Sequence, residues 1–439
     1  MAAHPPGLRL AAYGFLGLPL AMAALPIYVH VPKFYADTLG LSLAGVGAIL
    51  LAARLVDAVQ DPFLGWWSDR ARARGGGRWA FVAAGAPLLA LGMAGLFHPP
   101  AAGSAGLQWW LVANLVLVYT AYSLVTVSYL AHGAEITDDV AGRTRVTAWR
   151  EAFALVGVFL AAALPELLRQ SLGEREGFAR FALLFAPLVL LAAAVTIRGS
   201  PAAHARRPPA GTTPFRAFTL PLGNPAFRRL LAVFVLNGIA AAIPATLVLF
   251  FIEDVVGRAD LAPAFLVAYF AAGAAGLPLW VALSRRIGKA RAWLAAMVLS
   301  IAAFIWAFLL GPGDVAAYFA ICILSGIGLG ADLALPPSLL ADVIDGDEAR
   351  GRGRNEGAYF GLWSLATKAN LALAAGIALP LLQAFGYAPG VESTAQALLV
   401  LAGVYALLPC ALKLLAAAAL ANAMTLRFAG VGGTADERG

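Results

Sequence analysis

Charged residues are scarce in this chain of 439 residues, since Asp, Glu, Lys and Arg together make up only 13% of it. Soluble globular proteins contain about twice that share, roughly 25%. Long polar stretches are also rare: 61% of the residues are hydrophobic, and apolar runs of about 18 residues or more, the length that crosses a bilayer, recur along the chain. These features exclude a soluble enzyme, a disordered chain and a nucleic-acid-binding protein. Few segments show strand-like alternation, which also excludes a membrane β-barrel.

The chain has only two cysteines, Cys322 and Cys410, and both lie in apolar segments. Neither their spacing nor their surroundings indicate a disulfide or a metal site, so we expect both to be small hydrophobic side chains. The sequence contains no zinc-type histidine cluster, no nucleophile elbow and no phosphate-binding loop. We therefore predict that the protein is not an enzyme, holds no cofactor and has no nucleic-acid partner.

The apolar runs predict an all-α polytopic membrane protein with twelve transmembrane helices. Their expected limits are 10–35, 41–66, 79–97, 108–133, 148–168, 178–197, 228–252, 262–283, 292–311, 315–341, 357–383 and 395–421. The longest polar gap, 198–227, is rich in Pro and Arg and divides the spans six and six. We therefore predict an N-terminal six-helix bundle (1–197), a cytoplasmic linker (198–227), a C-terminal six-helix bundle (228–421) and a cytoplasmic tail (422–439).

Basic residues are distributed unevenly among the loops between these spans. One alternating set of loops, which includes the linker, is rich in arginine, and the other set is not. In the first set, basic residues follow spans 2, 4, 8 and 10: Arg70, Arg72, Arg74, Arg78, Arg143, Arg145, Arg285, Arg286, Lys289, Arg291, Arg350, Arg352 and Arg354. The positive-inside rule places this set and both termini in the cytoplasm, which also accounts for the net charge of +7. We expect a monomer in the inner (plasma) membrane of a bacterium.

The two halves carry similar charged loops after their fourth helices. Residues 134–138 read Ala-Glu-Ile-Thr-Asp, residues 341–345 read Ala-Asp-Val-Ile-Asp, and arginines follow both. Cytoplasmic loops are commonly charged, but the matching register indicates a duplicated six-helix unit, and many secondary transporters are built from two such units around a midplane cavity. The candidate gating residues are the charged residues of these loops and one acid between spans 2 and 3: Asp69, Glu135, Asp138, Arg143, Arg145, Asp342 and Asp345.

Span 2 contains three ionisable residues, Arg54, Asp57 and Asp61. An ionisable group at the centre of a membrane helix costs at least about 2.5–3.5 kcal/mol and therefore needs a partner or water. Asp57 and Asp61 are four residues apart, so they share one helix face, and Arg54 lies on nearly the same face. Two neighbouring carboxylates repel each other unless a cation or a proton binds between them. The pair predicts a site for Na⁺ or H⁺; the alternative is a structural cluster in which Arg54 neutralises Asp57.

Polar residues deep in other spans are candidates for a central cavity. Lys368 in span 11 lies about eleven residues, roughly 16 Å, from the inner end of its helix, too deep for easy snorkelling. We expect Lys368 and Arg54 to form a charge network with the two acids. Arg150 has the alternative of a simple pair with Glu151. Thr120 is a candidate cation ligand, and the substrate-binding candidates are Tyr122, Ser123, Thr126, Arg150, Asn237, Asp332 and Trp363.

These motifs resemble those of a known transporter family. The run Arg54-x-x-Asp57-Ala58-x-x-Asp61-Pro62-x-x-Gly65 is similar to the helix-II signature of the glycoside-pentoside-hexuronide:cation symporters, which belong to the major facilitator superfamily. Further matches lie at 13–15, 135–145, 340–345 and 356–363, the last followed by Lys368. The resemblance covers nearly the whole chain. It implies a major facilitator fold in which Asp57 and Asp61 hold Na⁺ or H⁺ with help from Thr120, Lys368 lies close to them, and Arg150 approaches the substrate.

The sequence departs from this family at its known sugar contacts. The aspartates that grip the sugar in the melibiose permease fall here on Ala21 and Ser123, and its sugar-stacking tryptophan falls on Val127. An asparagine of its cation motif falls on Gln60. A polyhydroxylated substrate needs many hydrogen bonds, and this lining offers fewer charged acceptors. Animal lysophospholipid symporters resemble the same family and keep a similar acid pair, so an amphipathic substrate stays open.

The sequence therefore predicts a secondary active symporter that imports a small organic solute by alternating access, driven by Na⁺ or H⁺. The family default is a sugar or glycoside, and the first alternative is an amphipathic solute such as a lysophospholipid. The second alternative is a non-transporting sensor on the same fold. A pure scaffold, however, has no need to hold Asp57, Asp61 and Lys368 within lipid.

Overall fold

The computed structural model describes residues 7–73, 78–137, 140–202, 221–349, 356–389 and 394–425. Helices dominate, and no β-strand occurs within these ranges. Twelve helical segments of the described chain, from Gly7–Thr38 to Ala395–Met424, are long and apolar enough to cross a membrane. The all-α fold class and the twelve predicted spans are thereby confirmed, with limits that differ by up to eight residues.

The chain divides into two compact units. The first comprises Met1–Gly211, Ala375–Ala384 and Ala388–Glu392, and the second comprises Thr212–Ala374, Phe385–Tyr387 and Ser393–Gly439. The boundary between the main parts of the two units thus falls in the Pro- and Arg-rich gap noted in the sequence, of which residues 203–220 lie outside the described chain.

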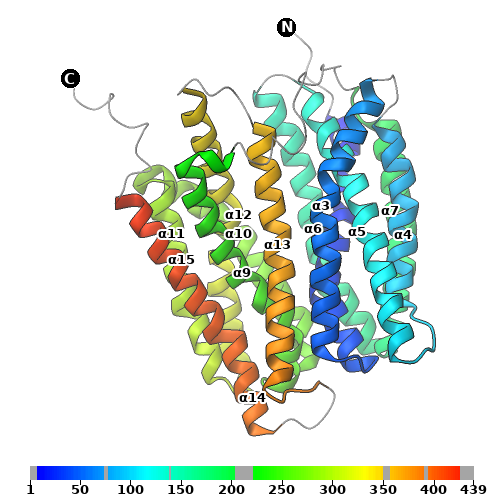
Figure 1. The fold of residues 1–439 in the computed structure, drawn as a ribbon, viewed down its shortest axis with the longest axis vertical. Helices are drawn as coiled ribbons and strands as arrows, with labels where there is room; N and C mark the ends of the chain where they lie inside the picture. Colours follow the sequence, from blue (N-terminus) through cyan, green and yellow to red (C-terminus); the bar gives the residue numbers. More distant parts are fainter. Residues whose placement is uncertain are drawn as a thin grey trace. The chain divides into compact units, whose positions relative to one another are not determined.

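The first unit consists of long helices packed side by side (Figure 1). They are α1 (Gly7–Gly14), α2 (Gly17–Lys33) continued by the π-helix η1 (Phe34–Thr38), α3 (Leu43–Ala73), α4 (Trp79–Phe97), α5 (Ser104–Glu135), α6 (Val140–Leu172) and α7 (Glu174–Gly199). Helix α2 packs on α6, α3 packs on α5, and α4 packs on both α5 and α7. Gly173 connects α6 to α7 with φ of 86°, a conformation that glycine adopts without steric strain.

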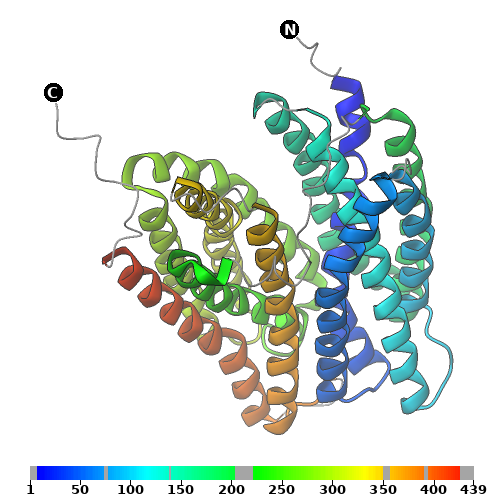
Figure 2. The same ribbon diagram turned by 45° about the horizontal axis from the view of Figure 1, so that its top comes forward.

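The second unit has the same all-helical construction. Its elements are η2 (Pro221–Gly223), α9 (Pro225–Asp254), η3 (Ala259–Leu261), α10 (Ala262–Ile287), α11 (Lys289–Phe304), η4 (Ile305–Leu309), α12 (Val315–Ala349), most of α13 (Glu356–Ala384), α14 (Ala395–Ala402), η5 (Gly403–Leu407) and α15 (Leu408–Thr425). Helix α12 packs on α10 and α11, and α15 packs on α9 and α11 (Figure 2). Helix α9 begins at Pro225 because the Asn224 side chain accepts a hydrogen bond from the Ala226 N–H at 3.0 Å.

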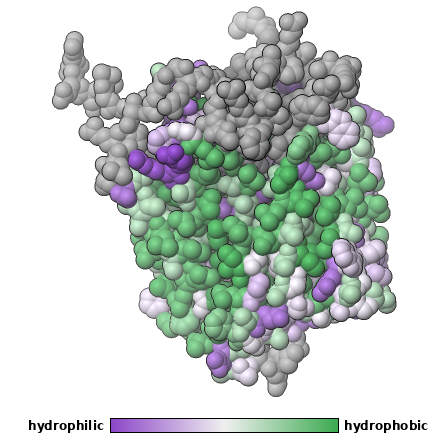
Figure 3. Space-filling model, viewed as in Figure 1, coloured by the Kyte–Doolittle hydropathy of each residue, from purple (hydrophilic) through white to green (hydrophobic). Residues whose placement is uncertain are grey.

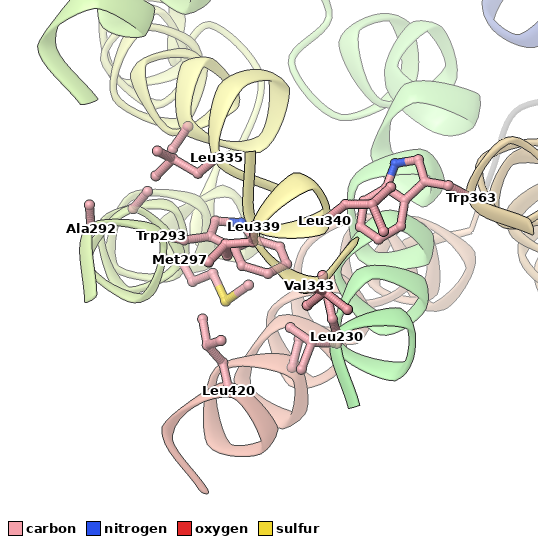
Figure 4. Packing of buried hydrophobic residues seen from close by; sticks show 14 of the residues in the cluster. Leu230, Ala292, Trp293, Met297, Leu335, Leu339, Leu340, Val343, Trp363 and Leu420 are labelled. Carbon is pink, nitrogen blue, oxygen red and sulfur yellow. The ribbon is translucent and has the colours of Figure 1, made fainter. Parts of the chain in front are cut away.

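Large apolar side chains fill the interior of the second unit (Figure 4). Trp293 and Met297 of α11 lie against Leu339 of α12, while Leu230 of α9 and Leu420 of α15 belong to the same buried cluster. Cys322 and Cys410 are both free and buried, as the sequence predicted.

The outer surface is apolar as well. Hydrophobic residues cover most of the visible face in Figure 3, and hydrophilic residues gather toward the ends of the helices. Trp109 and Trp306, for example, are 74% and 60% exposed. An apolar surface of this extent is normal for helices that a bilayer surrounds, and aromatic side chains are enriched where such helices meet the lipid headgroups.

Small residues allow close contact between helices, as is common in membrane proteins. At Gly157 of α6, an added Cβ would lie 2.1 Å from the Leu18 carbonyl oxygen of α2. At Gly361 of α13, an added Cβ would meet nothing within 4 Å. The α2–α6 crossing therefore depends on a missing side chain.

We predict that Gly157→Ala lowers the free energy of unfolding by roughly 1–3 kcal/mol, because the new methyl forces α2 and α6 apart. Gly361→Ala is the matched control and should leave stability nearly unchanged. Thermal unfolding of the purified variants in detergent measures both. Equal melting temperatures for the two variants would contradict the close contact at Gly157.

Candidate functional site

Asp57 lies in the interior of the first unit, where it is only 1% exposed. Its Oδ1 accepts a hydrogen bond from Ser123 Oγ of α5 at 2.8 Å and another from Gln60 Nε2, one turn along α3, at 3.3 Å. Its Oδ2 lies 3.2 Å from Arg54 Nη1, one turn before it. Donors from two helices thus hold this carboxylate in a fixed orientation, as a buried charge requires.

The charge of Arg54 is shared between the carboxylate and an aromatic ring. The Arg54 guanidinium carbon lies 4.1 Å from the centre of the Tyr119 ring, in cation–π geometry. The Arg54 side chain is 11% exposed. Arg54 and Asp57 therefore form the ion pair that was the alternative reading of this cluster. The second acid, Asp61, is one turn further along the same helix face.

The polar residues of α5 are arranged differently around Asp57 than their predicted roles suggest. Ser123, a substrate-binding candidate, donates directly to Asp57. Thr120, the candidate cation ligand, donates to Gln60 Oε1 at 2.9 Å and reaches Asp57 through that amide. The oxygens of Asp57, Gln60, Thr120 and Ser123 therefore form one connected group, with Asp61 half-buried beside it on α3. Oxygen ligands of this kind suit a hard cation, and a carboxylate also suits a proton.

The other candidates of the first unit are less closely connected with Asp57. Tyr122 and Thr126 are half-buried on α5. Arg150 of α6 pairs with its neighbour Glu151, with Nε 3.0 Å from Oε1, and its side chain is 28% exposed. This pair is the structural alternative considered for Arg150.

The gating candidates lie near helix ends. Arg78 Nη2 lies 2.7 Å from Glu135 Oε1, both side chains being 8% exposed, and Arg78 Nη1 donates to Ser68 Oγ at 3.2 Å. This contact ties the ends of α3, α4 and α5 together. In the second unit, Lys289 Nζ lies 2.6 Å from Asp342 Oδ1. Arg145 and Asp345 are exposed, whereas Asp138 and the side chains of Asp69 and Arg143 lie outside the described part of the chain.

Two separate candidates of the second unit, Asn237 and Asp332, lie together in one largely buried network, in which the Asp332 side chain is 15% exposed. Asp332 Oδ1 accepts hydrogen bonds from Asn237 Nδ2 at 2.9 Å and from Trp293 Nε1 at 2.7 Å. Lys413 Nζ lies 3.0 Å from Asp332 Oδ2 and donates to Asn237 Oδ1 at 2.7 Å. Four helices, α9, α11, α12 and α15, thus contribute to this network. The sequence reasoning missed Lys413, although a lone lysine within the last apolar run was a signal for it.

Trp363 and Lys368 lie on α13. The Trp363 ring stacks on Phe234 of α9, with ring centres 3.8 Å apart and planes inclined by 24°, and Figure 4 shows Trp363 at the edge of the apolar cluster. Lys368 is half-buried. It belongs to the second unit and Asp57 to the first, so the charge network expected between them stays a prediction.

The chain is similar to known transporters over nearly its whole length. The family model described as MFS/sugar transport protein matches residues 10–422. The uncharacterized symporter sll1374 of Synechocystis is 23% identical, covering 86% of this chain and 85% of that protein. The putative glycoside/cation symporter YagG of Escherichia coli is 25% identical, covering 78% and 75%, and the sphingosine-1-phosphate transporter MFSD2B of Mus musculus is 23% identical, covering 76% and 71%.

Solved structures share the fold. A bacterial homolog of the human lysosomal transporter Spinster superposes with a TM-score of 0.67, covering 96% of this chain and 95% of that one. At 19% sequence identity, this likeness concerns the arrangement of the helices alone.

We predict that Asp332→Asn destabilises the protein by about 3–5 kcal/mol, because it leaves the buried Lys413 ammonium without its counter-charge. The double variant Asp332→Asn, Lys413→Met should recover most of that loss, since it removes both charges. The melting temperatures of the wild type, Asp332→Asn and the double variant, measured by thermal unfolding in detergent, test this prediction.

The control for this prediction is Asp260→Asn, which breaks an exposed pair with Arg258. Exposed pairs contribute little to stability, so this variant should resemble the wild type. If Asp332→Asn were as stable as Asp260→Asn, the buried pair would not hold α12 and α15 together.

Proposed function

This chain belongs to the family of MFS/sugar transport proteins, and from that premise we propose that it is a cation-coupled symporter that imports a small organic solute. The resemblance found in the sequence is thereby confirmed, and the chain is a membrane transporter of the MFS type, not an enzyme. The observation that carries the proposal is the buried Asp57 carboxylate in membrane-spanning helix α3, with Asp61 one turn away.

Asp57 and Asp61 are the proposed binding site for the coupling ion, Na⁺ or H⁺. Two carboxylates on one helix face repel each other when both are ionised, and a bound cation or proton removes that repulsion. Ser123 supports this role because it already orients Asp57 Oδ1, and Thr120 supports it through Gln60. Two of the three relatives described above carry the word symporter in their names, which supports an ion-driven mechanism.

Coupling requires only that each ligand bind one state of the carrier better than the other. Ion binding then shifts the balance between outward- and inward-open states, and solute binding shifts it further. We retain Arg54 and Lys368 as the coupling residues. Arg54 is supported by its contact with Asp57, and Lys368 by its depth in α13. We also propose that both termini lie in the cytoplasm, on the charge distribution of the loops. The bacterial relatives support an inner (plasma) membrane of a bacterium, where we propose that the protein is a monomer.

A sugar or glycoside is the first proposed substrate, supported by the family and by the name of the Escherichia coli relative. An amphipathic solute is the second candidate. It is favoured by Ala21 and Ser123, which stand where the melibiose permease, by the resemblance, has its sugar-binding aspartates. The Ser123 hydroxyl moreover donates its hydrogen bond to Asp57. The name of the mouse relative, a sphingosine-1-phosphate transporter, supports the same candidate.

We predict that purified protein in liposomes accumulates one of two probes, melibiose or lysophosphatidylcholine, when an inward Na⁺ or H⁺ gradient is applied. Asp57→Asn and Asp61→Asn should each abolish the effect of the gradient, a change of roughly 5- to 150-fold by the usual size of coupling between two ligands. Labelled solute retained in the liposomes is the measurement.

Asp260→Asn is the control, since Asp260 pairs with Arg258 at the surface, and it should accumulate solute as the wild type does. Gradient-driven uptake that persists unchanged in both site variants would show that the ion binds elsewhere. A probe that binds, raises the melting temperature and is never accumulated would favour the non-transporting sensor.

A further inference from the structure

Another buried pair of titratable side chains lies in the first unit, at the end of α2 opposite to the chain's N-terminus. His30 is fully buried, and Glu166 of α6 is 1% exposed. His30 Nδ1 lies 3.4 Å from Glu166 Oε1. Within the described chain, neither ring nitrogen of His30 makes a hydrogen bond. The imidazole is thus held next to a carboxylate without the hydrogen bond that a neutral ring would normally make.

Glu166 belongs to a short chain of charges on α6 and α7. Arg169 Nε lies 2.8 Å from Glu166 Oε2, and Arg169 Nη1 lies 2.7 Å from Glu174 Oε1. Thr38 Oγ1 donates to Glu174 Oε2 at 3.3 Å. Arg169 therefore serves two carboxylates at once. The charges of Glu166, Arg169 and Glu174 add up to one negative charge when His30 is neutral. When His30 is protonated, the four side chains together are neutral.

The other charged residues near this end have partners of their own or lie at the surface. Lys33 Nζ, one turn after His30, lies 2.8 Å from Asp37 Oδ2. On α7, Arg180 pairs with Glu176 and Arg175 is exposed. The imidazole also lies near an apolar ring, Phe178 of α7, with ring centres 5.6 Å apart.

We propose that His30 and Glu166 form a proton-binding site of the first unit, separate from Asp57 and Asp61. Either protonation state can donate the Nδ1 hydrogen to Glu166, but only the protonated ring adds an attraction between opposite charges at a site that is shielded from water. A protonated His30 places a positive ring 3.4 Å from the Glu166 carboxylate, and a small rotation of the ring would point the N–H at that oxygen. The pair then ties α2 to α6. A metal ion is disfavoured because, among the described residues, no further His, Cys, Asp or Glu joins His30 and Glu166 in a group that could hold one.

The test is the pH dependence of thermal unfolding of the full chain in detergent, at about pH 8 and about pH 5.5, on either side of the range in which histidine titrates. The ion pair exists in the folded state only, so its contribution is present at low pH and lost as pH rises. Wild-type protein should gain about 1–2 °C in melting temperature relative to His30→Gln when the pH is lowered.

His98→Gln is the matched control, because His98 is exposed and bonds only the Ala94 carbonyl oxygen of its own helix within the described chain; it should follow the wild type at both pH values. Equal pH dependence of wild type and His30→Gln would overturn the proposal, as would a loss of wild-type stability relative to that variant on acidification. The site variants Asp57→Asn and Asp61→Asn should keep the difference, which separates this site from the proposed coupling site.

A second measurement keeps the proposal testable if His30→Gln does not fold. Wild-type protein labelled with ¹³C at the histidine Cε1 positions can be titrated by NMR, and the His30 signal can be assigned by elimination with Gln at the other four histidines. The signal should titrate over this pH range. A His30 signal that stays in its neutral form throughout would overturn the proposal.

Discussion

The cost of placing a charge inside a lipid bilayer governs how both units are built. An ionisable side chain at the centre of a membrane helix costs at least about 2.5–3.5 kcal/mol, so a folded chain keeps such a side chain only where partners surround it. Asp57 meets this requirement with donors from α3 and α5, and Asp332 meets it with donors from α9, α11 and α15. Because the partners come from different helices, each buried charge also determines how those helices pack.

The two acidic centres differ in what they are suited to do. Asp332 is matched by Lys413, and both of its oxygens accept hydrogen bonds, so the network is closed and a mobile ion would have to displace a protein cation. Asp57 is paired in the same way, with Arg54, and both of its oxygens also accept hydrogen bonds. The difference is that Asp57 shares its helix face with a second acid, Asp61. The repulsion between two carboxylates changes as soon as one small cation or proton binds. The Asp332–Lys413 network is therefore suited to holding helices together, and the Asp57–Asp61 pair is suited to a response to an ion.

The features that depend on one helix alone could be predicted from the sequence. Span 79–97 coincides with α4 because bilayer thickness sets the length of an apolar helix, and the contact between Arg54 and Asp57 follows from their spacing of three residues. Contacts between helices could not be predicted in this way. Asn237 and Asp332 were recognised only as separate candidates, and Lys413 was missed, because a polar residue in an apolar run does not reveal which distant helix packs against it.

The same distinction explains why the sequence predicts the proposed ion site more specifically than it predicts the solute. The proposed coupling acids lie within one turn of α3, so a short motif carries them. The solute contacts that the sequence predicts are spread over α5, α6, α9, α12 and α13, where the role of each residue depends on the packing of several helices. Ser123 illustrates this dependence: it occupies a sugar-contact position of the family, yet its hydroxyl is bound to Asp57. The fold does not remove the ambiguity, since a structure with a TM-score of 0.67 shares only 19% of its residues with this chain. A helix arrangement that tolerates so many side-chain replacements can carry many solutes, so the solute has to be determined by the few side chains that reach it.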